Sequence, residues 1–530
     1  MTELGKATII IGLFSLLSKI SGLARDAIFS HEFGTNKVLD AYFAAFRIPD
    51  FLFNLLIAGT VTVAFIPIFS EYFHKDKKEA WQLASNILNA TVLAMAGLAF
   101  LALIFSVPLM KLLAPGFSGE TYELTLKFTR ILLFSPIFLA GSAITGSVLN
   151  SLKKFALVSA VPVVYNLSII GGVLLLYPKL GPIGLAWGVV GGTLLYFLLP
   201  LPQLFRSGFR YFLSLDYRQA GFMKFWQLYW PRIFTMGTGQ ISLIIATFFG
   251  SYLSEGSLSA FYYANNLQSV FLSVFAISAS IAVFPTLSDL YNQKDEQRFR
   301  DVLAKTTVQV LYFLVPLSVA MLVLRAQIVR LLLGIGEGTN FSFQDTKIVS
   351  LTLGIFVVSL FAQGLVPLFT RAFYARHNTK IPVVTSLISL VVNIILAYYL
   401  VSQYGIAGMA MSFSFTVILQ LLMLLVELHR KIGSLHDEYL ILSSIKIAIS
   451  SVIAGLAIYV SLYLVAPLVD MQTYVGVFVQ ALGSGFIGGL CFLGASLALG
   501  LEESRHLTTM VKSFMVKISR PLLMIINIWE

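Results

Sequence analysis

The chain has 530 residues, of which 58% are hydrophobic and only 12% are charged, and its mean hydropathy is +0.86. Soluble domains carry about 25% charged residues, so this composition excludes an ordinary soluble protein. The single cysteine excludes a disulfide framework and a cysteine-based metal site, while the formal net charge of +11 has to be explained by where the basic residues lie.

Apolar runs long enough to cross a bilayer follow one another from end to end, without a long polar block between them. They cover residues 7–30, 39–71, 83–112, 124–150, 155–177, 182–204, 224–250, 258–290, 303–333, 346–374, 381–401, 405–427, 440–467 and 474–499. The first run is not a cleaved signal peptide, because Lys19 interrupts it and no small-residue cleavage site follows. The pattern predicts an all-α polytopic membrane protein with about 14 transmembrane helices.

The basic residues are distributed unequally between the two sides that these runs define. The even-numbered loops and the C-terminal tail hold most of the lysines and arginines, Arg371 among them, whereas the short odd-numbered loops hold only Lys37 and Lys179. This is the positive-inside asymmetry of a chain with both termini in the cytoplasm. The net positive charge is therefore interpreted as a topology signal, and no nucleic-acid partner is expected.

The first run carries polar residues on one helical face, including Lys19, Gly22, Arg25 and Asp26. A charge within the bilayer is costly and is retained where it faces a cavity or a partner, so Lys19 is expected to face a cavity. Arg25 and Asp26 lie nearer the outer end of the run. An interfacial ion pair that fixes the depth of the helix is the alternative to a binding role for these two residues.

The second run carries Asp40, Arg47, Asp50 and Asn54 at offsets that place all four on one stripe of a continuous helix. Pro49 deprives the carbonyl one turn earlier of its donor and predicts a bend next to Arg47. A bent helix with an arginine at the bend suits an anion site. In the alternative interpretation, Arg47 pairs with Asp40 or Asp50 inside the bundle.

The chain repeats itself at an offset near 219 residues. The motif 41–43 with its helix end at 64–67 returns at 260–262 and 282–285, and an even number of runs separates the copies. This predicts a parallel repeat of two six-helix lobes enclosing a cavity that opens alternately to either side. The expected organisation is an N-lobe over 1–222, a C-lobe over 223–432, two extra spans over 433–500 and a cytoplasmic tail over 501–530 that forms an amphipathic interfacial helix.

The equivalent helix of the second lobe has amides where the first has charges, namely Asn265, Asn266 and Gln268. The N-lobe is therefore expected to form the charged half of the cavity and the C-lobe helix the hydrogen-bonding half. Asn166 and Asn393 lie within other apolar runs, where an amide commonly bonds between helices. No nucleotide-binding loop is visible, and no histidine pair has a metal-ligand spacing.

Several motifs together resemble the MurJ (MviN) family. They are Ser21-Gly22-Leu23-Ala24-Arg25-Asp26, Phe33-Gly34, Asp40-Ala41, Phe46-Arg47-Ile48-Pro49, Ala64-Phe65-Ile66-Pro67, Gln240-Ile241-Ser242-Leu243-Ile244-Ile245 and Tyr262-Tyr263-Ala264-Asn265. The resemblance implies a lipid II flippase of the MOP exporter superfamily in the bacterial inner membrane. Such a protein is not an enzyme and moves the undecaprenyl-pyrophosphate-linked peptidoglycan precursor to the outer leaflet by alternating access. It needs no ATP or other cofactor and uses the membrane potential or an ion gradient; we expect it to act as a monomer.

By position, the resemblance assigns the cavity cations to Lys19, Arg25 and Arg47 and the acidic positions to Asp26 and Asp40. Two departures concern arginines that grip the pyrophosphate in the family. This chain has Phe53-Asn54 in place of an arginine pair and Asn266 in place of a later arginine. Asn54 and Asn266 are therefore the expected polar substitutes.

Three other classes of protein compete with this interpretation. Another MOP-type exporter would carry small molecules or an undecaprenyl-linked oligosaccharide, and a drug-cation pump would favour acidic over basic cavity residues. A polyprenyl-phosphate glycosyltransferase would need clustered carboxylates or histidines near one membrane face, which the loops lack. A structural scaffold would not need charges at bilayer depth.

Overall fold

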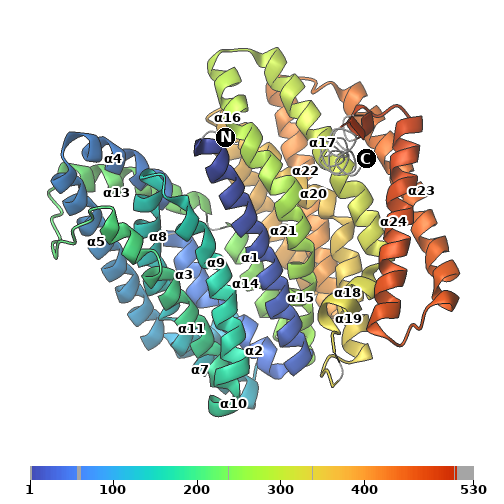
Figure 1. Ribbon diagram of the computed structural model, residues 1–530, viewed down its shortest axis with the longest axis horizontal. Coiled ribbons are helices and arrows are strands. Elements are labelled where there is room, and N and C mark those ends of the chain that lie inside the picture. The colour runs from blue at the N-terminus through green and yellow to red at the C-terminus, as the bar shows by residue number, and fades with distance from the viewer. Residues whose placement is uncertain (1–2, 57–60, 237, 337, 506–507, 510–530) are drawn as a thin grey trace, which may run out of the picture. The chain divides into compact units, whose positions relative to one another are not determined.

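The computed structural model describes residues 3–56, 61–236, 238–336, 338–505 and 508–509, and within them all regular structure is helical (Figure 1). The helical segments are α1 (Glu3–Phe33), α2 (Lys37–Ala45), α3 (Arg47–Leu56), α4 (Val61–Lys75), α5 (Lys77–Ile104), α6 (Ser106–Leu113), α7 (Gly119–Leu132), α8 (Ser135–Ser151), α9 (Phe155–Gly171), η1 (Gly172–Leu176), α10 (Tyr177–Leu180), α11 (Ile183–Leu198), α12 (Leu201–Arg206), α13 (Ala220–Met236), α14 (Thr238–Gly250), α15 (Ser257–Phe271), η2 (Leu272–Ile277), α16 (Ser278–Asn292), α17 (Glu296–Val323), α18 (Arg325–Leu333), α19 (Phe343–Val358), α20 (Leu360–Ala375), α21 (Lys380–Tyr404), α22 (Ile406–Ile432), α23 (Asp437–Val465), η3 (Ala466–Leu468) and α24 (Tyr474–Ala498).

Within the described residues, ten helical stretches are long and apolar enough to cross a membrane, or up to 11 if α19 and α20, which meet at 46°, form one span. Of the remaining predicted runs, 7–30 lies in the long helix α1, whereas 39–71 and 224–250 are divided into shorter helices. The all-α polytopic fold is thus confirmed. The number of 14 spans stays a prediction.

The division of run 39–71 begins at Phe46, between α2 and α3. Pro49 has no amide hydrogen, so the carbonyl of Ala45 loses its donor at the position where α2 ends. The predicted bend next to Arg47 is therefore confirmed. The expectation that four polar residues share one face of a continuous helix is therefore wrong. Asp40 lies on α2, while Arg47, Asp50 and Asn54 lie on α3.

The chain forms two compact units. The first comprises Met1–Tyr263, Leu332–Val349 and Leu390–Ser412, and the second comprises Ala264–Leu331, Ser350–Ser389 and Phe413–Glu530. The first unit therefore includes residues from both halves of the predicted repeat, whereas the second contains none from 1–222. The lobe boundaries at 222, 432 and 500 stay a prediction, and the helix predicted for 501–530 lies mainly outside the described residues.

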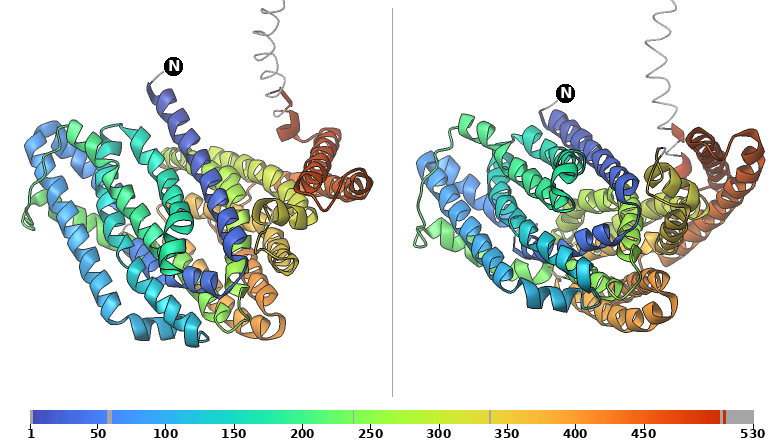
Figure 2. Two further views of the ribbon diagram at one scale, coloured as in Figure 1. Left: turned by 60° about the horizontal axis from the view of Figure 1, so that its bottom comes forward. Right: turned by 90° about the horizontal axis from the view of Figure 1, so that it is seen from below.

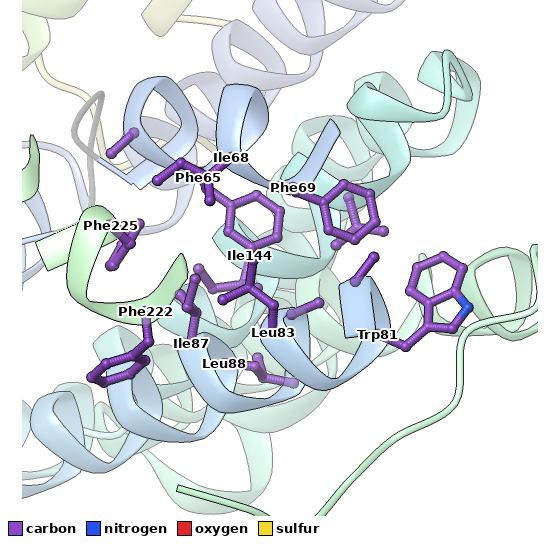
Figure 3. Packing of buried hydrophobic residues seen from close by; sticks show 14 of the residues in the cluster. Phe65, Ile68, Phe69, Trp81, Leu83, Ile87, Leu88, Ile144, Phe222 and Phe225 are labelled. Atoms are coloured by element: carbon purple, nitrogen blue, oxygen red, sulfur yellow. The ribbon is translucent and has the colours of Figure 1, made fainter. Parts of the chain in front are cut away.

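The first unit has an aromatic core where α4, α5, α8 and α13 meet (Figure 3). Phe65 stacks on Phe69 with ring centroids 5.3 Å apart, and Phe69 contacts Trp81 at 5.5 Å. The edge of Trp81 in turn meets Phe209, which follows α12, at 5.5 Å. This core fixes the segment after α12 to α5. In the same unit, α1 packs along α9 (Figure 1).

Segment 332–349 is held in the first unit by polar contacts with the end of α1. The Asn340 backbone N–H donates to the His31 carbonyl (2.9 Å), and its side-chain amide donates to the carbonyl of Glu32 (2.7 Å). The Thr35 hydroxyl donates to the carboxylate of Asp345, which also accepts the Ser342 N–H that precedes α19. These bonds join stretches of chain some 300 residues apart in sequence.

The second unit contains the antiparallel hairpin of α23 and α24 at the red end of the colour scale (Figure 2). Small residues allow close helix contact there. An added Cβ at Gly455 would lie 2.5 Å from Val319 on α17, and one at Gly488 would lie 2.2 Å from Ile458 on α23. Glycines on α23 and α24 therefore fix the hairpin to itself and to α17.

Candidate functional site

Arg47 is the first residue of α3 and only 7% exposed, although it is a cation within an apolar run. Its Nε donates to the carbonyl of Phe43 (3.2 Å), and its guanidinium lies over the ring of Tyr262, 4.8 Å from the centroid. The nearest carboxylate is Asp50, at 3.6 Å. That distance is long for a charge-assisted hydrogen bond, so Asp50 compensates the charge of Arg47 only loosely.

Asp40 does not pair with Arg47, although the helical spacing of the sequence placed the two residues on one face. Its carboxylate is 3% exposed and accepts the backbone N–H groups of Gly256 and Ser259, both at 2.7 Å. These amides belong to the first turn of α15, where backbone donors have no partner within the helix. Asp40 therefore caps α15 and lies at its positive end.

Arg25 and Asp26 form the ion pair that was one of the two sequence interpretations. The guanidinium donates to Oδ1 of Asp26 through Nη2 (2.7 Å) and Nε (3.0 Å), and its Nη1 donates to Oδ1 of Asn166 (3.2 Å). The amide group of Asn166 donates in turn to the carbonyl of Ser18 and to the hydroxyl of Ser21, both at 3.2 Å. The expectation that Asn166 bonds between helices is confirmed, because it joins α9 to α1.

Lys19 lies on α1, half-buried and two turns before Arg25. Within the described part of the chain it has no hydrogen-bond or ion-pair partner, unlike Arg25 and Arg47. If α1 crosses the membrane as the sequence predicts, an unpaired ammonium on it needs water or a ligand anion to compensate its charge. Asn54, by contrast, donates to the carbonyl of Asp50 one turn earlier on α3 (2.8 Å).

Two tyrosines of the first unit, the buried Tyr42 and the half-buried Tyr165, belong to the same helices or helix neighbours as these charged groups. Tyr42 meets the rings of Phe29 and Phe46 edge-on (5.2 and 4.8 Å between centroids), and Tyr165 meets Tyr196 edge-on (6.3 Å). Sequence reasoning missed both tyrosines because an aromatic residue in an apolar run carries no distinctive signal. The first unit thus holds two sets of charged side chains, Arg25 with Asp26 on α1 and Arg47 with Asp50 on α3.

The second unit holds the predicted neutral residues on α15. Asn266 is half-buried there, and its carbonyl accepts the hydroxyl of Ser269 (2.8 Å). Gln268 is fully buried; it donates to Asn265 (3.3 Å) and accepts from the amide of Gln363 on α20 (3.0 Å). Gln363 was missed because its partner lies 95 residues away in sequence.

Arg371 corrects the assignment of that residue to a cytoplasmic loop. It lies inside α20, four residues before the helix ends, and donates to the hydroxyl of Ser280 on α16. In the sequence, the polar end of this apolar run predicts the start of a loop, whereas the helix continues to Ala375. No carboxylate pairs with Arg371 within the described residues, and those residues include no group of three or more His, Cys, Asp or Glu side chains suited to a metal ion.

Comparisons with known proteins agree with this architecture. The family model described as "Lipid II flippase MurJ" matches residues 29–481. The probable lipid II flippase MurJ of Buchnera aphidicola subsp. Acyrthosiphon pisum is 28% identical over 504 residues, covering 94% of this chain and 98% of the relative. That of Haemophilus influenzae is 30% identical over 400 residues, covering 72% and 77%.

Among solved structures, "Lipid II flippase MurJ, inward closed conformation" superposes with a TM-score of 0.76 at 28% identity, covering 92% of this chain and 98% of that one. An inward-facing multidrug resistance MATE family transporter of the MOP superfamily gives a TM-score of 0.65 at 13% identity, covering 79% and 96%. At that identity, the MATE likeness concerns the fold alone.

Proposed function

The chain belongs to the lipid II flippase MurJ family, and from this membership we propose that it moves lipid II from the inner to the outer leaflet of the bacterial inner membrane by alternating access. In the proposed orientation both termini are cytoplasmic, as the distribution of lysines and arginines indicates. The flippase acts as a monomer, performs no covalent chemistry, and is driven by the membrane potential or an ion gradient.

The observation that carries the proposal is that two cations of the first unit, Lys19 and Arg47, are weakly compensated by protein groups. The pyrophosphate of lipid II needs positive charge at bilayer depth, and an ammonium or guanidinium can bind it only if its present partner is weak. Among the residues that the structure describes, Lys19 has no hydrogen-bond or ion-pair partner, and the carboxylate paired with Arg47 lies at 3.6 Å. These two residues are therefore the proposed primary ligands of the pyrophosphate.

Arg25 is proposed in a supporting role. Its guanidinium already donates to Asp26 at 2.7 Å and to Asn166, so a substrate phosphate would have to compete with a formed ion pair. Asn54 is proposed to add a neutral hydrogen bond near Arg47, and Asn266 is proposed as a further neutral ligand. In Asp40, both carboxylate oxygens are occupied by the amides of α15, so its contribution to binding is indirect.

Single substitutions of the two primary cations test this assignment. We expect Lys19→Ala and Arg47→Ala to abolish translocation of fluorescent lipid II in proteoliposomes and to fail to support growth of a strain depleted of its own flippase. Lys19→Arg should retain activity because it preserves the charge. Lys305→Ala, which removes an exposed lysine of α17, is the matched control.

The same assay separates the proposal from its main alternative. Thermal unfolding in detergent must show that the inactive variants remain folded. Continued lipid II translocation by the triple variant with alanine at 19, 25 and 47 would refute the site assignment. Translocation of an undecaprenyl-linked O-antigen precursor in preference to lipid II would instead assign the chain to another MOP-type export activity.

A further inference from the structure

The connection between α12 and α13 is an extended strap over residues 209–217 that is bonded to α5. The amide group of Asn89 donates to the carbonyls of Phe212 (3.1 Å) and Ser214 (2.9 Å), while the Phe212 N–H donates to the hydroxyl of Ser85 (3.1 Å). The Tyr211 hydroxyl donates to Oδ1 of Asn89 (2.9 Å). The strap therefore has a fixed face toward α5.

The strap also carries exposed apolar side chains at every second position. They are Tyr211, Leu213, Leu215 and Tyr217, and Leu213 is 90% exposed. Exposed apolar rows of this kind mark a surface that meets a partner or a membrane. Alternating tyrosine and leucine side chains suit the boundary between lipid head groups and acyl chains.

A groove of about 620 Å³ lies beside the strap, entirely within the first unit. Its walls come from α5, α8, α11, α12 and the strap itself, and they are apolar apart from a few polar side chains. The wall residues used below are Leu93, Phe205 and Leu213. This volume falls within the range of about 300–1,000 Å³ typical of small-ligand sites.

Two arginines lie in the chain segment that forms the groove. Arg206 ends α12, directly after Phe205, and Arg210 precedes Tyr211. Both are exposed, and neither has an ion pair within the described residues. Lys154 lies close by, since it donates to Ser207 (2.8 Å). The two arginines do not line the groove themselves, but each is the sequence neighbour of an aromatic residue that does, Phe205 or Tyr211. The distribution of basic residues predicts that this part of the chain lies at the cytoplasmic face.

We propose that this groove binds one acyl chain of an anionic phospholipid of the inner leaflet, whose phosphate is held by Arg206 and Arg210. The apolar wall and the exposed row of the strap fit a lipid chain, and clustered basic residues at the cytoplasmic end of transmembrane helices favour an anionic head group. The undecaprenyl tail of the proposed cargo is much longer than the groove accommodates. The site is separate from the charged residues of α1 and α3 and does not depend on the proposed transport activity.

Photolabelling of the full chain in lipid nanodiscs tests the site. The probe is phosphatidylglycerol with a diazirine near the end of one acyl chain, and phosphatidylcholine with the same chain is the comparison probe. Labelled peptides are identified by mass spectrometry. We expect adducts from phosphatidylglycerol to concentrate on the α5 and α12–strap peptides that line the groove.

Two substitutions of exposed residues should remove this labelling without affecting folding. Leu93→Trp places an indole in the groove mouth, and each methylene it excludes weakens binding about fourfold. Leu213→Asp adds a negative charge beside the phosphate. Leu101→Trp is the matched control, because Leu101 is a similarly exposed leucine of α5 outside the groove.

The head-group assignment has its own variants. Replacing Arg206 and Arg210 together by alanine should reduce labelling by phosphatidylglycerol and leave the weaker labelling by phosphatidylcholine unchanged, while Arg298→Ala should alter neither. The proposal is overturned if adducts spread evenly over the lipid-facing helices, or if Leu93→Trp leaves the groove adducts intact. It is also overturned if an undecaprenyl phosphate probe labels the groove in preference to phosphatidylglycerol.

Discussion

Replacing Asp40 by alanine should destabilise the first unit, because the carboxylate caps α15 through two bonds of 2.7 Å. The substitution leaves two buried N–H groups without an acceptor, and each costs about 1–3 kcal/mol. Part of this loss is offset because a buried carboxylate no longer has to be desolvated. We therefore expect a net loss of about 2–4 kcal/mol, at the upper end of the values for lost helix caps.

Asp40→Asn makes the test sharper. The amide has one oxygen and can accept from only one of Gly256 and Ser259, while its NH₂ group faces the other donor. The Asp40→Asn variant should therefore be as stable as Asp40→Ala or slightly more stable. Glu255→Gln is the control, because Glu255 is exposed next to the capped turn without bonding to it.

The measurement is thermal unfolding in detergent, followed by intrinsic tryptophan fluorescence at one scan rate, since membrane proteins of this size often unfold irreversibly. One kcal/mol shifts Tm by about 2–4 °C in chains of 150–250 residues and by less in longer ones, so both Asp40 variants should lose several degrees. Unchanged Tm values together with lost transport would refute the capping argument and make Asp40 a direct cargo ligand.

Two further predictions concern close packing and the α1–α9 network. Gly408→Ala should destabilise the protein by about 1–3 kcal/mol or more, because the added Cβ would lie 2.0 Å from the backbone oxygen of Leu400. Gly97→Ala is the control and should be neutral or stabilising, because no atom lies within 4 Å of its added Cβ. Equal Tm values for the two variants would contradict this argument. Asn166→Leu should cost about 1–3 kcal/mol, since Arg25 loses an acceptor and α1 loses its amide donor. An unchanged Tm for Asn166→Leu would show that the network adds no stability.

Local features of the fold could be predicted from the sequence because their causes are local. The apolar runs predicted the helices, and Pro49 predicted the break beside Arg47 because a proline acts on the carbonyl four residues earlier. The energetic cost of a charge within the membrane likewise indicated that Lys19 faces a cavity or a ligand. The proposed cargo ligands therefore rest on residues that the sequence had already indicated.

The ion pairs of Arg25 with Asp26 and of Arg47 with Asp50 were among the alternatives that the sequence offered, but the partners far away in sequence could not be predicted. The donors to Asp40 lie more than 200 residues later, and the acceptor of Arg25 lies 141 residues later. No spacing rule relates positions that meet only through tertiary packing. Helical spacing therefore predicted that Asp40 lies beside Arg47, whereas the hydrogen bonds of Asp40 show that it caps the start of α15.

The first unit is built from three separate segments of the chain, and this has a consequence for its folding during synthesis. Segment 332–349 is bonded to the end of α1, and residues 390–412 belong to the same unit. Chains emerge from the ribosome at about 5–20 residues per second, and domains usually fold in order of synthesis. Here the unit that contains the N-terminus completes its packing only after residue 412 has been made. While only residues 1–222 have been made, their helices can pack on one another, but the end of α1 still lacks the partners that segment 332–349 supplies. The membrane must hold that end until the later segments have been synthesised.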